Sequence, residues 1–163
     1  MCGIAGIISN RIIKNSYYEQ KNYMKNLMFN RGPDHQDAMN YKDANSDLRF
    51  FHSRLSIIDI NRRSNQPYKF KNYVLIFNGE IYNYKEIKKK LIYKGYKFIT
   101  SSDTEVLLKA YSHWGKNCVK YFDGMWAFAI FDKNKKEVFI SRDNFGEKPL
   151  FYYFDEKEFI FGS

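Results

Sequence analysis

The residue best suited to chemistry is Cys2, because removal of the initiator methionine would leave a thiol and a free α-amine on one residue. An α-amine titrates at ~7.7 to 8.0 and a free thiol at ~8.5, so the amine can take the thiol proton near neutral pH, directly or through one water. Small residues at the second position permit removal of Met1, and cysteine is small. Cys2 is therefore a candidate nucleophile that carries its own base, the cysteine counterpart of an N-terminal threonine nucleophile.

Cys2 alone is weak support for such chemistry, since a cysteine beside an apolar stretch is more often a small core residue. Its neighbours strengthen the interpretation. Residues 1–7, MCGIAGI, resemble the opening of class II glutamine amidotransferases, the family with an N-terminal cysteine nucleophile. Six further motifs continue the resemblance along essentially the whole chain: RGPD (31–34), RLSIID (54–59), NGEIYN (78–83), SDTE (102–105), GMWAFA (124–129) and RDNFGEKPL (142–150). The RGPD and NGEIYN stretches are most similar to the asparagine synthetase branch of this family.

The resemblance implies a reaction and a fold. Cys2 would attack the side-chain amide of L-glutamine, ammonia would leave, and water would hydrolyse the resulting thioester to release glutamate. The Asn78 amide and the Gly79 backbone N–H would stabilise the oxyanion formed in the attack. The implied fold is of the α+β class, a four-layer αββα sandwich of two antiparallel sheets flanked by helices, of the N-terminal nucleophile hydrolase type. Residues 1–163 would form one glutaminase domain.

The same resemblance implies how glutamine is held. Arg54 would bind the α-carboxylate through two parallel charge-assisted hydrogen bonds, which lysine cannot reproduce. Backbone groups of Leu55 and Ile57 would help to hold the ligand, and Glu80 and Asp103 would bind its α-ammonium group. The expected substrate-binding set is Arg54, Leu55, Ile57, Asn78, Gly79, Glu80 and Asp103.

These residues also have purely structural interpretations. Asn-Gly at 78–79, between apolar runs, is the strongest short-range signal for a hairpin turn. Arg54 could be an ordinary cation on an edge strand, and Asp103 a favourable charge in the first turn of a helix. Residues 31–34 are predicted to form a turn that shapes the wall around Cys2.

A Cys–His dyad is the alternative catalytic arrangement. It would use one of the three histidines, His35, His52 and His113. None of them stands in a papain-like context. The α-amine also makes a histidine base unnecessary, so we do not expect this dyad.

Secondary-structure signals predict how these residues are positioned. Three helix starts combine a capping residue with a glutamate three positions later: Ser16 with Glu19, Asn83 with Glu86, and Ser102 with Glu105. Runs rich in Ile, Val, Phe and Tyr predict strands at 4–8, 55–60, 73–77, 125–131, 138–141, 150–154 and 159–161. Short turns at 133–136 and 155–157 favour antiparallel pairing, which predicts a layered antiparallel α+β fold.

Composition limits the other possibilities. With 163 residues, 44% of them hydrophobic, the chain suits one domain with a substantial core. The net charge of +9 includes lysine runs typical of solvated faces, so we expect no nucleic-acid partner. Two cysteines without a CxxC pair predict no disulfide scaffold and no metal site, with Cys118 in the core. Without a signal peptide or a long apolar run, we expect a cytoplasmic protein without a membrane association.

The resemblance also concerns partners. Family members continue into an ATP-dependent synthetase domain with a Ser-Gly-Gly-x-Asp-Ser motif, which does not occur in these 163 residues. We therefore expect no cofactor in this domain, and ATP and Mg²⁺ only in a C-terminal synthetase domain or partner subunit that receives ammonia. The acceptor could be aspartate, or a sugar or other carboxylate. A non-catalytic binding module on the same fold is a further alternative, and a homodimer is left open.

Overall fold

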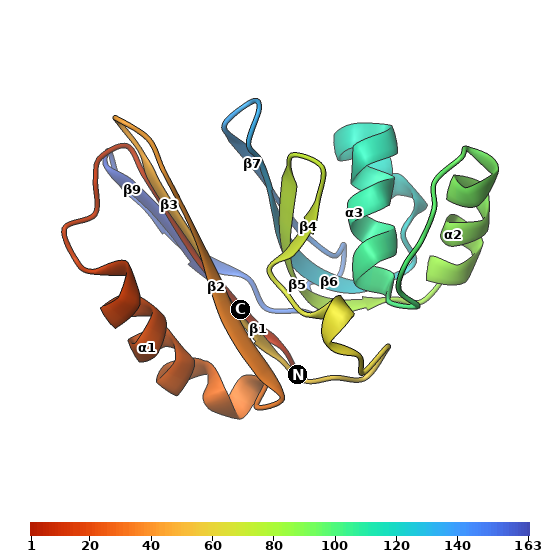
Figure 1. Ribbon diagram of the computed structural model, residues 1–163, viewed down its shortest axis with the longest axis horizontal. Coiled ribbons are helices and arrows are strands. Elements are labelled where there is room, and N and C mark those ends of the chain that lie inside the picture. Colours follow the sequence, from red (N-terminus) through yellow and green to blue (C-terminus); the bar gives the residue numbers. More distant parts are fainter.

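The computed structural model describes residues 1–163, in which two antiparallel sheets lie face to face with helices on their outer sides (Figure 1). The first sheet, in spatial order, contains β2 (His35–Lys42), β3 (Asp47–Arg54), β1 (Gly3–Ser9), β9 (Glu158–Gly162) and β8 (Phe151–Phe154). The second contains β4 (Tyr68–Phe70), β5 (Tyr73–Ile81), β6 (Gly124–Asp132) and β7 (Glu137–Arg142). The α-helices are α1 (Tyr17–Met28), α2 (Tyr84–Tyr93) and α3 (Asp103–Trp114), and short 3₁₀ helices occupy Phe29–Arg31, Arg62–Ser64 and Gly115–Tyr121.

The helices cover the outer face of each sheet. Helix α1 contacts β2 and β3, α3 contacts β4 and β5, and α2 packs against α3. The layers therefore run helix, sheet, sheet, helix across the molecule in Figure 1. This confirms the predicted α+β sandwich of two antiparallel sheets flanked by helices.

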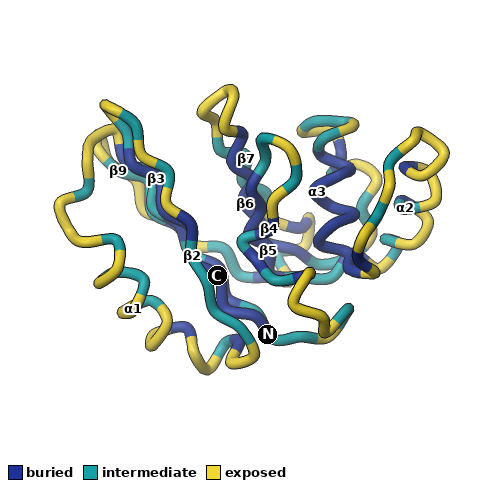
Figure 2. The backbone as a smooth tube through the Cα atoms, viewed as in Figure 1, coloured by how far each residue is buried: buried dark blue, intermediate teal, exposed yellow.

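Apolar side chains fill the space between the sheets. Ile4 and Phe50 of the first sheet pack in one cluster with Ile76 and Ala129 of the second. A separate cluster joins the outer face of the second sheet to α2 and α3 and includes Leu107. Figure 2 shows the resulting dark centre of the second sheet and α3. The second sheet is thus covered on both faces, which explains the near-continuous apolar runs of β5 and β6.

The three predicted helix starts are confirmed, but only Ser102 forms a side-chain cap, and Glu105 binds the backbone nitrogens of Ile99 and Thr100 rather than that of Ser102. Ser102 accepts a hydrogen bond from the Thr104 backbone N–H at 3.1 Å. Ser16 makes no side-chain cap bond, and neither does Asn83. The Asn83 amide instead holds the backbone of residues 121 and 123, because these residues lie beside the start of α2.

The strand predicted at 55–60 is wrong. The chain leaves the first sheet at the end of β3, and residues 55–61 form an irregular loop. The Arg54 side chain explains the change of direction, since its guanidinium binds the carbonyl oxygens of Ile58, Asp59 and Asn61. These carbonyl groups are therefore satisfied by a side chain rather than by a neighbouring strand.

Two further corrections concern β-structure. Strands β2, β3 and β4 were not predicted from the sequence; β3 is buried throughout although it contains Asp47 and Arg49, which form an ion pair of 3.0 Å. The alternative interpretation of residues 78–79 as a hairpin turn is also wrong. Asn78 pairs with Ala127, and Gly79 with Trp126, inside the ladder between β5 and β6. Pairing with a long partner strand has overridden the local Asn-Gly signal.

Three further observations concern the cysteines, the helices and clusters of metal-ligating side chains. Cys118 is buried in the helix-side core, as predicted, and it is a free thiol, as is Cys2. No helix combines the length and apolar character that crossing a membrane would require. The structure also brings no three His, Cys, Asp or Glu side chains together in an arrangement that could hold a metal ion.

Candidate active site

One cavity of about 160 Å³ collects every residue that the sequence predicted for the site. These residues are Cys2, Arg54, Leu55, Ile57, Asn78, Gly79, Glu80 and Asp103. They come from four places: the residue before β1, the end of β3 with its following loop, the last part of β5, and the first residue of α3. The remaining lining residues are Met1, Ile58, Gln66, Phe77, Ser102, Thr104, Met125 and Lys148.

The Cys2 thiol lies against the backbone of Leu55. Its Sγ atom is 3.4 Å from the Leu55 nitrogen, which donates to it, and 3.5 Å from the Leu55 carbonyl oxygen. Burial raises the pKa of the thiol above its ordinary value, although the Leu55 N–H and the positive charges of the N-terminus and Arg54 partly oppose this. Cys2 is consequently a neutral thiol at neutral pH and needs a proton acceptor to become a nucleophile.

The RGPD segment (residues 31–34) contacts the backbone of Cys2 and Arg54. Arg31 donates from Nη2 to the Cys2 carbonyl oxygen at 3.1 Å. A Cβ on Gly32 would lie 2.5 Å from backbone atoms of Ser53 and Arg54, so no larger residue fits there. The Asp34 carboxylate accepts from the Ser56 backbone nitrogen at 2.6 Å. This segment therefore holds the backbone beside Cys2 and Arg54, but none of its four residues lines the cavity itself.

Asn78 and Gly79 lie on β5, opposite the first sheet. Gly79 approaches β6 so closely that a Cβ would overlap the Met125 carbonyl oxygen and lie 2.7 Å from the Trp126 Cα. The Asn78 residue is only 1% exposed, and its side-chain nitrogen donates to Ser163 Oγ at 3.1 Å. The two expected oxyanion donors are therefore held in the ladder between β5 and β6, beyond the residues of β5 that pair with β4.

The peptide before Asn78 is fixed by two side chains that sequence reasoning did not assign. Gln66 accepts from the Phe77 nitrogen at 2.6 Å and donates to the Phe77 carbonyl oxygen at 3.2 Å. His52 places Nε2 at 3.2 Å from the same carbonyl oxygen, and burial lowers the pKa of this histidine to about 3. His52 is thus a neutral core residue that joins the two sheets, and none of the three histidines lines the cavity.

Arg54 lines the cavity, but its terminal nitrogens hold the loop. Nη1 donates to the Asn61 carbonyl oxygen at 3.1 Å and to Asn65 Oδ1 at 2.6 Å, and Nη2 donates to the carbonyl oxygens of Ile58 and Asp59. A guanidinium has five N–H groups, so these contacts leave Nε–H without a partner. One free N–H cannot make the two parallel hydrogen bonds expected from the sequence. Binding of a carboxylate by Arg54 remains a prediction, to which the structure adds a role in shaping the loop.

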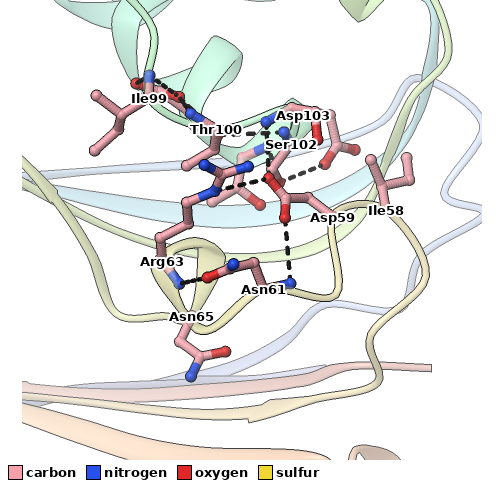
Figure 3. Close-up of polar contacts among 12 residues, drawn as sticks. Ile58, Asp59, Asn61, Arg63, Asn65, Ile99, Thr100, Ser102 and Asp103 are labelled. Carbon is pink, nitrogen blue, oxygen red and sulfur yellow. Dashed lines mark hydrogen bonds and ion pairs between the residues drawn. The ribbon is translucent and has the colours of Figure 1, made fainter.

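Asp59 connects this loop to the start of α3, as Figure 3 shows. Its carboxylate accepts from the Asn61 nitrogen at 3.2 Å and from the Ser101 nitrogen at 2.7 Å, and lies 3.5 Å from Arg63 Nε. Burial opposes ionisation, but the hydrogen bonds from Ser101 and Asn61 outweigh it and lower the pKa of Asp59 to about 2. The Asp59 carboxylate is therefore charged, and it links the loop after β3 to the start of α3.

Glu80 and Asp103 bring two carboxyl groups to the same end of the cavity. Asp103 accepts from the Ile81 backbone nitrogen at 3.1 Å and is 4% exposed. Burial raises the pKa of Asp103 to about 6, and the neighbouring Glu80 charge acts in the same direction. A ligand cation placed between them would relieve both the repulsion and the cost of burial.

The RDNFGEKPL motif supplies a cation that the sequence did not single out. The Asp143 carboxylate accepts from the backbone nitrogens of Phe145, Glu147 and Lys148, which folds residues 143–148 into a tight turn. This turn directs Lys148 into the cavity, where Nζ lies 3.0 Å from Met1 Sδ. In the sequence, only the RDNFGEKPL motif pointed to Lys148, and the motif assigned no role to any single residue.

Comparison with known proteins finds similar sequences over the whole chain. Residues 1–163 match the model of a family described as a glutamine amidotransferase domain. The chain is similar to putative asparagine synthetase (glutamine-hydrolyzing) 2 of Methanocaldococcus jannaschii, with 41% identity over 100% of this chain and 34% of the relative. It is 36% identical to asparagine synthetase (glutamine-hydrolyzing) 3 of Bacillus subtilis, over 100% of this chain and 26% of that protein. For asparagine synthetase B of Escherichia coli the identity is 35%, over 96% of this chain and 27% of the relative. The chain thus spans about a quarter to a third of the length of these curated relatives.

Proposed function

The chain belongs to the glutamine amidotransferase domain family, in the branch of glutamine-hydrolysing asparagine synthetases, and we propose that it hydrolyses L-glutamine with Cys2 as the nucleophile. The observation that carries the proposal is the convergence of all eight predicted site residues on one cavity. They come from two sheets and a helix, and no local sequence pattern requires them to meet.

The proposed reaction begins after Met1 has been removed. The thiol proton of Cys2 moves to the new α-amine, and the sulfur attacks the side-chain amide carbon of glutamine. The C–N bond then breaks, the same amine returns the proton to the leaving nitrogen, and ammonia departs. Water adds to the thioester, the C–S bond breaks, and glutamate leaves as the sulfur regains a proton.

The other residues take the roles that their positions allow. Asn78 and the Gly79 N–H stabilise the oxyanion from β5, a rigid position that suits electrostatic catalysis. Glu80 and Asp103 bind the α-ammonium group of glutamine. Arg54, with backbone groups of Leu55 and Ile57, binds its α-carboxylate, and the loop carbonyl groups on the Arg54 Nη atoms keep the guanidinium in place.

The fate of ammonia concerns the longer relatives. We propose that ammonia passes to a synthetase domain or partner subunit, which uses ATP and Mg²⁺ and transfers nitrogen to aspartate or to another carboxylate. The names of the relatives favour asparagine formation. No step of glutamine hydrolysis described above uses either cofactor. Two free thiols are compatible with a cytoplasmic location, which is part of the same proposal.

The test is glutamate release by protein whose N-terminus has been verified by intact mass. Cys2→Ala is expected to abolish release while leaving the far-UV circular dichroism and melting temperature unchanged. Cys118→Ala is the matched control, since it removes the other thiol from the helix-side core and should retain kcat. Full activity in Cys2→Ala would disprove the assignment, and glutamine binding without glutamate production by the processed protein would favour a non-catalytic module.

A further inference from the structure

We propose that Ser163 is a positioning residue that orients the Asn78 carboxamide for oxyanion stabilisation and couples it to the strand that follows Cys2. The inference deepens the proposed glutaminase function and rests on it. Ser163 directly follows β9, which pairs with β1 in the first sheet. Asn78 lies on β5 in the second sheet, so this contact crosses from one sheet to the other.

The Ser163 hydroxyl oxygen receives two hydrogen bonds. Asn78 Nδ2 donates to it at 3.1 Å, and the Ile4 backbone nitrogen donates to it at 3.3 Å. The Ser163 backbone nitrogen in turn donates to the Ile4 carbonyl oxygen at 2.9 Å. Ser163 thus binds both backbone polar groups of Ile4, which is two positions after Cys2, and also the side chain of Asn78, the expected oxyanion donor.

Asn78 depends on this contact for its orientation. The torsion angle that turns an asparagine carboxamide has broad, shallow preferences, so hydrogen bonds must select the angle. Ser163 Oγ is the single hydrogen-bond partner of the Asn78 side chain, which is nearly fully buried. A side-chain NH₂ group has two donors, so one N–H can bind Ser163 and the other remains for the oxyanion.

The consequence for catalysis follows from the requirement for preorganisation. An oxyanion donor contributes most when it is already oriented before charge develops. Without the Ser163 hydroxyl, the buried Asn78 amide would lose its hydrogen-bond partner and could rotate. The N–H expected to bind the oxyanion would then have no fixed direction. Binding of the ground-state substrate uses other groups, so the loss should appear in kcat rather than in KM.

The test compares three single substitutions, and one double mutant with Asn78→Ala, in the processed 163-residue chain. Ser163→Ala removes the hydroxyl, and Ser163→Thr retains it. Ser9→Ala is the matched control, because Ser9 lies at the other end of β1, is 1% exposed, and uses its hydroxyl to bind the Arg11 nitrogen and the Lys157 carbonyl oxygen. It therefore removes a buried serine hydroxyl from the same strand pair without touching the cavity.

We expect Ser163→Ala to lower kcat roughly tenfold, the effect of one lost hydrogen bond, with KM nearly unchanged. Ser163→Thr should restore most of kcat, and Ser9→Ala should leave it unchanged even if its melting temperature falls as much as that of Ser163→Ala. In an Asn78→Ala background, Ser163→Ala should cause no further loss of kcat, because a positioning residue acts only through the group it positions.

Three results would overturn the proposal. They are a wild-type kcat in Ser163→Ala, a kcat loss in Ser9→Ala equal to that in Ser163→Ala, and an undiminished effect of Ser163→Ala in the Asn78→Ala background. Absence of glutamate release by the processed wild-type chain would be a different failure. That result would disprove the proposed glutaminase function, and the proposed role of Ser163 would no longer apply.

Discussion

On one side of the cavity Asn78 and Gly79 lie within β5, which pairs along its whole length with β6, whereas on the other side Arg54 ends β3 and holds an irregular loop. The first side is fixed by backbone ladders and by the contacts of Gln66 and Ser163. The second side is fixed by a guanidinium and by the Asp59 carboxylate. Groups expected to meet developing charge thus sit on the strand side, together with Glu80, while Arg54, the group expected to bind the α-carboxylate of glutamine, sits on the loop side. Substitutions on the two sides should separate kcat from KM.

The largest effect is expected from Gly79→Ala on the strand side. The new Cβ would overlap the Met125 carbonyl oxygen, so β5 must shift against β6, at a cost of about 1–3 kcal/mol in stability. Displacing the oxyanion donors should lower kcat about 10²- to 10³-fold, as measured by glutamate release. Gly162→Ala is the control, because a Cβ there lies no closer than 3.6 Å to its neighbours and should cost little stability. A wild-type kcat in Gly79→Ala would contradict the division between the two sides.

Arg54→Lys should produce the next largest effect, mainly in KM. Lysine cannot bind the four loop oxygens that the two Nη atoms hold, so the loop should loosen and the melting temperature should fall. We expect KM for glutamine to rise about 10- to 100-fold, with a smaller change in kcat. Arg63→Lys is the control, since the Arg63 side chain is 51% exposed and makes one ion pair with Asp59. Equal changes in both variants would argue against a special role for Arg54.

Asp103 gives the smallest effect at neutral pH and the clearest dependence on pH. Its pKa is raised to about 6, so the carboxylate that binds the α-ammonium group is lost as pH falls through 6, and KM should rise there, whereas kcat follows the α-amine base, which titrates at ~7.7 to 8.0. Kinetics between about pH 5 and 8 measure this, and a KM that stays constant over that range would contradict it.

The same shift has an opposite consequence for folding stability. The folded-state pKa of Asp103 lies above the unfolded value of ~3.9, so the folded state binds the proton more tightly, and stability falls as pH rises between these values. Asp103→Asn should therefore weaken glutamine binding at pH 7 without lowering the melting temperature. A large loss of thermal stability in this variant would show that its hydrogen bonds outweigh the cost of burying the charge.

Much of the architecture could be predicted, and the failures have identifiable physical causes. Apolar runs located β5 and β6, and a capping signal located the start of α3, but β3 escaped notice because its buried positions include Asp47, Arg49 and Arg54, which only tertiary partners can satisfy. Residues 55–60 have the composition of a strand, but the carbonyl oxygen of Ile58 accepts a hydrogen bond from the Arg54 guanidinium instead of from a neighbouring strand.

The candidate site shows the same limit. The resemblance named eight cavity residues, and the structure brings them together. It assigned nothing to Gln66 or Ser163, because their contacts with residues 77 and 78 span 11 and 85 positions of the chain. These contacts form only when the two sheets are assembled, so no local pattern in the sequence predicts them.

The pairing of β1 with both β3 and β9 has a consequence for the order in which the molecule becomes competent during synthesis. The thiol end of the chain is made first, but the strand beside it is completed only when residues 158–162 have been translated. A nascent polypeptide therefore carries its reactive sulfur without the surroundings needed to use it until β9 has been made. Release of ammonia is deferred until both strands that flank β1 are available.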